Sequence, residues 1–311
     1  MDGSEIRRGA TEPEVKRRKK RARSAAPAEA PSFRGVSNGE ASAGGGGGLT
    51  PGLTWTPQGS FTGANGVHYS ADRPIAVTVS DDEKMNKRTL YVSERSGKTH
   101  IQLPPHVQFS ILPPVDKDAR EVLSIAGAAG AGKSFIAREY ARRYKKMWPK
   151  RDVFVVSALN EDKTLDELKF LQRILVQTLV DDPLTNAIDA FSDSLVIFDD
   201  IEALVGEERR AVSELLDALL TLGRHSRTSV IVASHLPARG KETRLLLSES
   251  HRFVVMPHAL GFHTLRYLCT THLGLTPQQI TDLRSVHSRW VCLSKSFPQY
   301  QLSSGDVSLL T

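Results

Sequence analysis

An eight-residue stretch, Gly127 to Ser134, has the composition and spacing of a phosphate-binding loop. It reads Gly-Ala-Ala-Gly-Ala-Gly-Lys-Ser and matches the pattern G-x-x-x-x-G-K-S/T, between an apolar strand-like run and a helical pattern. Small residues let successive backbone N–H groups approach phosphate oxygens, and a helix start adds positive potential. The sequence therefore predicts nucleotide binding by Gly127, Ala128, Ala129, Gly130, Ala131, Gly132, Lys133, Ser134 and Phe135.

Two neighbouring carboxylates, Asp199 and Asp200, follow the apolar run Leu195-Val196-Ile197-Phe198. In a doubly wound sheet the carboxyl ends of the strands face the ligand crevice. We expect the hydroxyl of Ser134 and the carboxylate of Asp199 to bind Mg²⁺, and Asp200 to polarise the attacking water. Glu202 is a fallback base, which a continuing strand would aim elsewhere.

The second carboxylate, Asp200, helps to distinguish GTPase switches from other nucleotide hydrolases. GTPase switches use a single acid and a downstream Asn-Lys-x-Asp motif that reads guanine. The only Asn-Lys pair here, Asn86-Lys87, lies upstream of the phosphate loop. A hydrolase with a glutamate-like base therefore fits these residues better than a GTPase switch.

Two further polar positions lie beside the next predicted elements. Arg224 follows a long helical pattern and could reach the nucleotide of a neighbouring subunit, and His235 ends an apolar strand, where it could sense the γ-phosphate. Both also have ordinary structural explanations. An Arg at a helix C-terminus meets the helix dipole, and a single His is commonly just hydrogen-bonded.

The elements that must position these residues alternate between strand-like and helical patterns. Continuous apolar strands alternating with helices indicate a parallel sheet covered on both faces. Together with the phosphate loop, this pattern predicts an α/β fold class, a doubly wound, mainly parallel sheet of the P-loop NTPase kind. The expected strands are 122–126, 153–156, 195–198, 230–233 and 253–256, and the expected helices are 133–147, 165–180 and 207–222.

Composition divides the chain into three parts. Residues 1–70 hold 13 of the 23 glycines and 5 of the 16 prolines, which predicts a disordered tail. Residues 71–118 carry short strand patterns at hairpin spacing and form a short β-hairpin accessory segment. Prolines then mark a boundary, and residues 119–311 form the ATPase domain.

The positive charge is concentrated in the tail. Residues 1–25 hold nine Lys/Arg against four Asp/Glu, which accounts for +5 of the net +6. The basic run 16–23 fits a nuclear-import patch, a DNA-contacting arm or a solvated tail equally.

Two cysteines cannot make a disulfide framework, and no apolar stretch approaches the roughly 20 residues of a membrane span. We expect an intracellular protein with no membrane span.

Together these residues resemble the FtsK–HerA superfamily of ring-forming DNA-pumping ATPases, and within it the poxvirus-type virion-packaging ATPases of large DNA viruses. In such motors an acidic strand ends in Asp-Glu, and a long helix, a Gly-Arg pair, an apolar strand and a polar sensor follow. Residues 196–200, 223–224 and 230–235 look like these pieces. Asp200 is one methylene shorter than the usual Glu, and His235 stands where Gln is usual. The strand patterns 289–293 and 306–310 also resemble the way packaging ATPases finish.

The resemblance, over residues 119–311, implies a RecA/FtsK-like fold and a translocase that hydrolyses ATP with Mg²⁺. It would pump double-stranded DNA into a capsid without reading its sequence. It implies a homo-oligomeric ring, expected to be a hexamer, with a capsid or portal protein as a further partner, in a virion, a viral factory or the nucleus. It assigns Arg224 as an arginine finger and His235 as the sensor. Candidate DNA contacts are Arg138, Arg142, Arg143, Lys145, Lys146, Lys150 and Arg151, for which a solvated helix face is the better explanation, and the loop around Arg239 and Lys241.

Three other functions stay open. An AAA-type loader would add a helical lid with a second sensor arginine, for which residues 262–287 offer Arg266 or Arg284, but strand patterns after the lid argue against it. A nucleoside or nucleotide kinase would have no use for the second acid. A non-translocating ATP-dependent DNA clamp is the third.

Overall fold

The computed structural model describes residues 51–57, 61–62, 68–69, 72–94, 97–181, 187–235, 237 and 243–310. The basic run 16–23 lies outside these ranges. None of the helices in the described ranges has the length and apolar character that crossing a membrane would require. Cys269 and Cys292 are both free and buried, and burial raises the pKa of each thiol to about 12.

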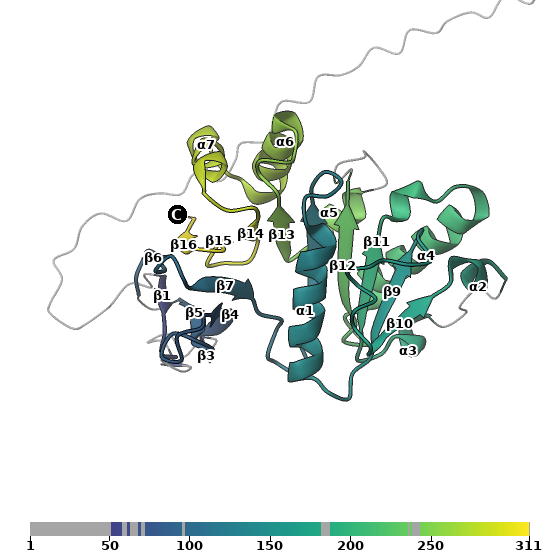
Figure 1. Ribbon diagram of the computed structural model, residues 1–311, viewed down its shortest axis with the longest axis horizontal. Helices are drawn as coiled ribbons and strands as arrows, with labels where there is room; N and C mark the ends of the chain where they lie inside the picture. Colours follow the sequence, from purple (N-terminus) through teal and green to yellow (C-terminus); the bar gives the residue numbers. More distant parts are fainter. Residues whose placement is uncertain are drawn as a thin grey trace, which may run out of the picture. The chain divides into compact units, whose positions relative to one another are not determined.

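A ten-stranded sheet forms the centre of the described chain (Figure 1). Six neighbouring strands run parallel to one another, and the remaining four continue the sheet with antiparallel pairing. This confirms the predicted doubly wound parallel sheet and adds an antiparallel extension. In spatial order the strands are β10 (Leu171–Ile174), β9 (Val153–Ser157), β11 (Leu195–Asp199), β12 (Ser229–Ser234), β8 (Val122–Ala126), β13 (Arg252–Val255), β14 (Val291–Ser294), β15 (Tyr300–Ser303), β16 (Asp306–Leu309) and β6 (His100–Gln102).

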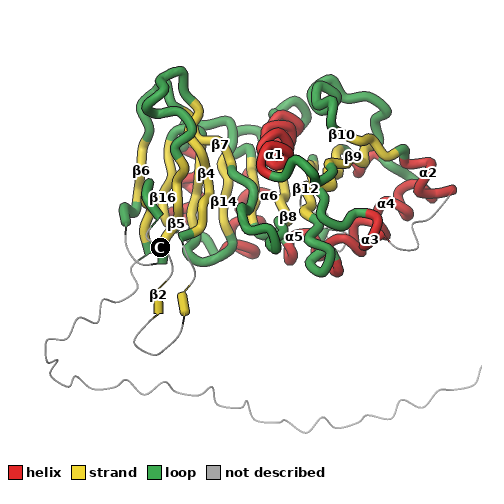
Figure 2. The backbone as a smooth tube through the Cα atoms, turned by 90° about the horizontal axis from the view of Figure 1, so that it is seen from below, coloured by secondary structure: helices red, strands yellow, loops and turns green. Residues whose placement is uncertain are grey.

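Helices cover both faces of the sheet, as Figure 2 shows. The long helix α1 (Lys133–Met147) lies on one face, where its residues Ile136, Tyr140 and Tyr144 join the core. The helices of the other face are α2 (Val176–Asp181), α3 (Ala187–Ala190), α4 (Gly206–Leu222), α5 (Arg244–Glu249), α6 (Phe262–Leu273) and α7 (Pro277–Ser285). Every residue of β8, β11 and β12 is buried, as the continuous apolar runs predict.

The predicted helix over 165–180 is wrong. Residues 171–174 form β10, which pairs parallel with β9, and only Val176–Asp181 are helical. Leu165 and Leu168 are buried as a helical period would require, but they lie in a turn. Pairing with the open edge of β9 satisfies the backbone of 171–174, and this tertiary gain overrides the local helical preference.

Residues 71–118 hold more than a hairpin, because three of their strands join one earlier strand in a second, antiparallel sheet. Its order is β1 (Gly52–Thr54), β5 (Thr89–Ser93), β4 (Arg73–Val79) and β7 (Gln108–Ile111). Strand β1 falls inside the tail 1–70 that composition predicts to be disordered, so that prediction is wrong for residues 52–54. Leu53 is 1 % exposed and pairs with Val92, which is enough burial to order a Gly- and Pro-flanked segment. Strands β2 (Phe61–Thr62) and β3 (His68–Tyr69) pair with each other.

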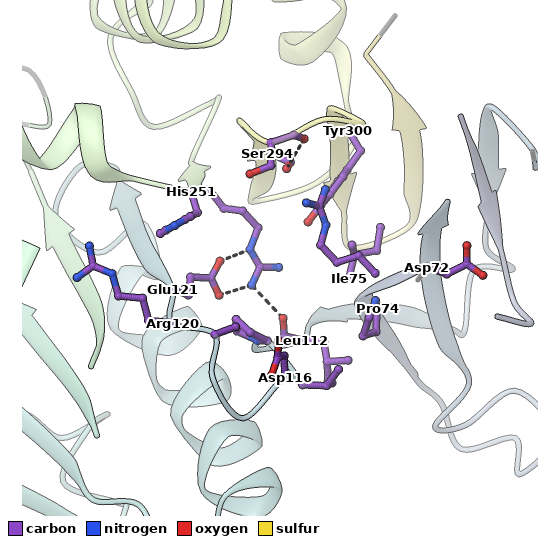
Figure 3. Close-up of a pocket in the computed structure, with 16 residues that line it drawn as sticks. Asp72, Pro74, Ile75, Leu112, Asp116, Arg120, Glu121, His251, Ser294 and Tyr300 are labelled. Carbon is purple, nitrogen blue, oxygen red and sulfur yellow. Dashed lines mark hydrogen bonds and ion pairs between the residues drawn. The ribbon is translucent and has the colours of Figure 1, made fainter. Parts of the chain in front are cut away.

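The second sheet is joined to the central ten-stranded sheet by buried polar contacts. Arg252, at the start of β13, forms an ion pair with Glu121 and donates from Nη2 to the backbone oxygen of Leu112 at 2.9 Å. The hydroxyl of Tyr140 donates to the same Glu121, and burial raises the pKa of that phenol. Leu112, Glu121 and Arg252 line a cavity of about 470 Å³ between the two sheets (Figure 3). Since β6 also pairs with β16, the accessory segment belongs structurally to the core.

Candidate nucleotide site

The predicted phosphate loop connects β8 to α1, at the upper end of α1 in Figure 1. Gly130 and Gly132 have φ angles of 71° and 106°, in the left-handed region that favours glycine. A Cβ on Gly127 would lie 2.6 Å from Cγ of Met256, so the close approach there also requires glycine. The first N–H groups of α1 have no intrahelical partner and are available to phosphate oxygens.

Lys133 extends from this loop into a group of acidic side chains. It is 5 % exposed, and its Nζ lies 3.0 Å from Nδ1 of His235 and 3.3 Å from the backbone oxygen of Ala128. Burial lowers the pKa of Lys133, and the nearby Asp200, Asp199 and Glu202 oppose this shift. The structure therefore brings the lysine and His235 together, although 102 residues separate them.

The structure brings together Ser134 and Asp199, the two residues predicted to bind Mg²⁺. The Ser134 hydroxyl donates to Oδ2 of Asp199 at 3.1 Å, while the buried Oδ1 has no hydrogen-bond partner among the described residues. Burial, and next the charge of Asp200, raise the pKa of Asp199 to about 6. A hydroxyl and a carboxylate with an uncommitted oxygen are ligands that Mg²⁺ accepts beside phosphate oxygens. The residues present fit this ion.

Asp200 leaves the line of its strand. Its φ of 52° is left-handed, a conformation that Asp tolerates better than most residues. Its Oδ1 lies 2.6 Å from Nε2 of His235, and both nitrogens of that ring, Nδ1 at 3.0 Å and Nε2 at 3.3 Å, lie close to Nζ of Lys133. A continuous polar path thus runs from Lys133 through His235 to Asp200.

Glu202 belongs to the site, but in a different role from the fallback base. The strand ends at Asp199, and the 3₁₀ turn η1 (Ile201–Ala203) brings Glu202 back toward β12. Its Oε1 accepts hydrogen bonds from the hydroxyl of Ser234 and, at 3.1 Å, from the backbone N–H of His235. Glu202 therefore positions His235. The expectation that Glu202 points elsewhere assumed that the strand continues past Asp200. A turn predicted directly after Asp199-Asp200 would instead have placed Glu202 near the site.

Arg224 lies at the other end of the sheet from the phosphate loop. It follows the last turn of α4, before β12 begins, and its side chain is exposed. Within the described ranges the side chain of Arg224 makes no hydrogen bond or ion pair. The structure therefore does not bring Arg224 to the site of its own chain, and its predicted role as a finger on a neighbouring subunit stays a prediction.

Most of the basic side chains on and after α1 are held by their own chain. Arg138 and Arg142 pair with Glu139 and Glu167, and the remaining partners are Ser110 for Arg143, the backbone oxygen of Arg151 for Lys145, and Asp193 for Arg151. These contacts favour a structural role over DNA contact. Arg239 and Lys241 lie outside the described residues.

The helices α6 and α7 occupy the place considered for an AAA-type lid. The guanidinium of Arg284 lies 5.3 Å from the ring centroid of Phe262, and β14, β15 and β16 then continue the central sheet. The strands after the helical pair disfavour a lid.

Strand order and site together define the class of protein. Strand β12 lies between the phosphate-loop strand β8 and the acidic strand β11, so that Ser234 and His235 fall between Lys133 and Asp200. This strand order, with the loop after β8 and the acidic end of β11, is the doubly wound fold of a P-loop NTPase.

The comparisons with known proteins identify a family. Protein V3 of the Sputnik virophage, which is itself uncharacterized, is 33% identical over 224 residues, covering 70% of this chain and 88% of V3. The chain belongs to the family of this virophage protein. No family model matches the sequence.

Several solved structures are similar to the chain. The genome-packaging NTPase B204 of Sulfolobus turreted icosahedral virus 2, in complex with AMPPCP, is 10% identical with a TM-score of 0.38, covering 57% of this chain and 93% of B204. The cytoplasmic domain of the type VII secretion ATPase EccC of Thermomonospora curvata is 15% identical with a TM-score of 0.46, over 67% and 28% of the two chains. The pCW3 conjugation coupling protein TcpA is 13% identical with a TM-score of 0.43, over 74% and 77%.

Proposed function

We propose that this chain hydrolyses ATP and uses the reaction to move double-stranded DNA, as a packaging motor of a virus. The observation that carries the ATPase proposal is the convergence of Lys133, Ser134, Asp199, Asp200 and His235 at one edge of the sheet. The packaging role is supported by the sequence motifs that resemble packaging ATPases and by the viral origin of V3.

The site suggests a sequence of events for hydrolysis. Phosphate oxygens of ATP bind the loop N–H groups and compete with His235 for the ammonium of Lys133. Mg²⁺ held by Ser134 and Asp199 would neutralise charge on the β- and γ-phosphates. Asp200 accepts the proton of the attacking water, and His235, held by Glu202, lies where it can contact the γ-phosphate.

The assembly is a ring of identical subunits, with six as the proposed number, in which Arg224 of one subunit completes the site of the next. DNA passes through the ring, held by contacts to its phosphates that carry no sequence information. A capsid or portal protein anchors the motor in the virion or viral factory.

The ATPase proposal is tested by comparing three variants of the full chain. Lys133→Ala removes the charge that binds the phosphates, so ATP turnover should fall to background. Asp200→Asn should keep ATP binding and lose at least about a hundredfold in turnover, the scale of a lost general base. Glu202→Gln is the matched control, because its amide oxygen can still accept from Ser234 and His235, and turnover should persist.

Turnover and oligomeric mass should be measured with and without double-stranded DNA. Stimulation by DNA in an oligomer supports the motor. Normal turnover of Asp200→Asn would remove that residue from the mechanism, and phosphoryl transfer to a nucleoside without any DNA effect would replace the motor by a kinase.

A further inference from the structure

The helices α6 and α7 carry a surface that the proposed hydrolysis does not use. Their buried sides join one apolar cluster, which includes Leu265 and Leu268 of α6 and Ile280 and Leu283 of α7. Their other sides face solvent. In Figure 1 the two helices lie at the top of the view, at the same end of the sheet as the phosphate loop.

The segment that contains both helices is poor in acidic residues. Residues 257–290 hold three arginines and four histidines against a single acid, Asp282. The carboxylate of Asp282 accepts a hydrogen bond from the side chain of Gln278 at 2.8 Å and contacts no cation among the described residues. The exposed arginines of this segment therefore give its surface a positive charge that nearby carboxylates do not cancel.

Two of these arginines, Arg266 of α6 and Arg284 of α7, are exposed and lie close to Phe262. The guanidinium of Arg284 lies 5.3 Å from the ring centroid of Phe262, which is 43 % exposed. Phe262 and Arg266 are four residues apart in α6, so they are neighbours on one face of that helix. Neither arginine forms a hydrogen bond or an ion pair with any residue in the described ranges. Their N–H groups therefore remain available to a ligand.

Guanidinium groups with free N–H donors suit phosphate oxygens. The planar guanidinium can donate two parallel bonds to one phosphate, and the contact with Phe262 restricts Arg284 before a ligand arrives. His263 and Tyr267 are also exposed on α6, and both can donate to phosphate or sugar oxygens. The chemistry of this surface is therefore that of a polyphosphate backbone.

We propose that α6 and α7 form the surface with which the motor binds the phosphate backbone of double-stranded DNA, through Arg266 and Arg284. The inference rests on the proposed function, because DNA is the partner proposed there. It assigns DNA contact to a different place from α1, where Arg138 and Arg142 are already paired with Glu167.

The backbone connects this surface to the phosphate loop. The N–H of Ala128 donates to the oxygen of Ala259 at 3.3 Å, and α6 begins three residues later, at Phe262. In the same region Gly127 approaches the side chain of Met256 so closely that a Cβ would lie 2.6 Å from its Cγ. A shift of α6 on binding DNA therefore acts on the loop that binds ATP, and this contact gives a route by which DNA stimulates turnover.

The test measures binding of the full chain to a mixed-sequence DNA duplex by fluorescence anisotropy, over a range of salt concentrations. In Arg266→Ala/Arg284→Ala the slope of log K against log salt should become shallower by about 0.9 for each lost phosphate contact, hence by at least about 1.8. Arg266→Lys/Arg284→Lys keeps both charges and should keep most of the slope. Lys84→Ala/Arg210→Ala is the matched control, because it removes the same charge from exposed positions on other elements and should leave the slope unchanged.

ATP turnover gives a second readout. Without DNA the Arg266→Ala/Arg284→Ala protein should turn over ATP like the wild type, because both side chains lie outside the nucleotide site, and its stimulation by DNA should be lost. Persistence of the full stimulation in this protein would contradict the proposed route from α6 to the loop.

Three results overturn the DNA surface and leave the proposed motor standing. The first is a wild-type salt slope in Arg266→Ala/Arg284→Ala, and the second is an equal loss of slope in Lys84→Ala/Arg210→Ala. The third is weakened binding of polyglutamate with the DNA slope intact, which would identify a surface for an acidic protein. A wild-type chain that binds no duplex at any salt concentration overturns both the surface and the motor.

Discussion

Three carboxylates surround Lys133, and their environments give them different roles. Asp199 is buried with one free oxygen, Asp200 reaches His235 from a left-handed turn, and Glu202 holds the end of β12. Burial, and next the charge of Asp200, raise the pKa of Asp199 to about 6. The site therefore carries a buried negative charge that folding alone does not favour.

Replacing Asp199 by Asn should stabilise the fold at high pH. Because the folded pKa of about 6 lies above the ordinary 3.8, the native state binds this proton more tightly than the unfolded chain. The stabilisation by the protonated form is fully present below pH 3.8 and is lost as the pH rises through 6. Two pKa units correspond to at most about 3 kcal/mol. Urea denaturation should show Asp199→Asn more stable than wild type by about 1–3 kcal/mol at pH 8 and little changed at pH 4, with hydrolysis lost.

Asp193 provides a control, because its pKa is shifted in the opposite direction from that of Asp199. A hydrogen bond and ion pair from Arg227 lower the pKa of Asp193, so its charge stabilises the fold above the ordinary pKa. Asp193→Asn should accordingly reduce stability at pH 8. Equal stabilities of Asp199→Asn and wild type at pH 8 would contradict the buried-charge account.

At the scale of elements, Gly223 sets how α4 ends. Arg120 donates to the backbone oxygens of Leu219 and Leu220, both at 2.8 Å, and so satisfies carbonyls of the last turn. A Cβ on Gly223 would lie 2.7 Å from Nη1 of Arg120 and 2.3 Å from the oxygen of Leu219. The close packing at the end of α4 therefore requires glycine at position 223.

We expect Gly223→Ala to lower the free energy of unfolding by about 1–3 kcal/mol, the usual cost of forcing atoms into a packed site. Chemical denaturation measures this change. Gly261→Ala is the matched control, because a Cβ there would meet nothing within 4 Å, and its effect should stay within a few tenths of a kcal/mol. A neutral Gly223→Ala would show that Arg120 moves aside at no cost.

Elements with strong local signals were predictable and those made by pairing were not. Helix α1 follows a glycine loop, and the apolar strands β8, β11 and β12 are buried on both faces, so sequence pattern alone finds them. Strands β1, β10 and β15 are short, and each is stabilised by pairing with a neighbouring strand rather than by a strong local pattern.

The same reasoning applies to the site. The loop motif and the acid pair carry local patterns, and they predict Lys133, Ser134, Asp199 and Asp200. The contacts made by Glu202 bring together distant parts of the chain, which no short sequence pattern contains.

At the scale of the whole molecule, Arg224 and the phosphate loop of one subunit lie at opposite ends of the central sheet. A ring in which each subunit completes its neighbour's site reconciles this separation with the proposed finger role. Activity would then depend on subunit contact and on protein concentration.

A mixing experiment tests the finger. Arg224→Ala alone should lose at least about a hundredfold in turnover, on the scale of a missing arginine finger. Asp200→Asn is inactive in its own site but retains Arg224, so mixed assemblies of the two variants should recover part of the turnover. Full activity of Arg224→Ala alone would exclude the finger role, and inactive mixtures that form rings would exclude action between subunits.

The pairing of β6 with β16 also has a consequence for how the protein is made. Residues 100–102 leave the ribosome long before their partners at 306–308, and β15 and β16 stand between β14 and β6 in the finished sheet. Until β16 is synthesised, β6 has no strand to pair with in the central sheet. The phosphate-loop strand β8 then lies in a sheet that still lacks β14, β15, β16 and β6. Such long-range closure slows folding and exposes strand edges to aggregation. A chaperone that shields the nascent accessory segment would therefore raise the yield of folded ATPase more than one acting after release.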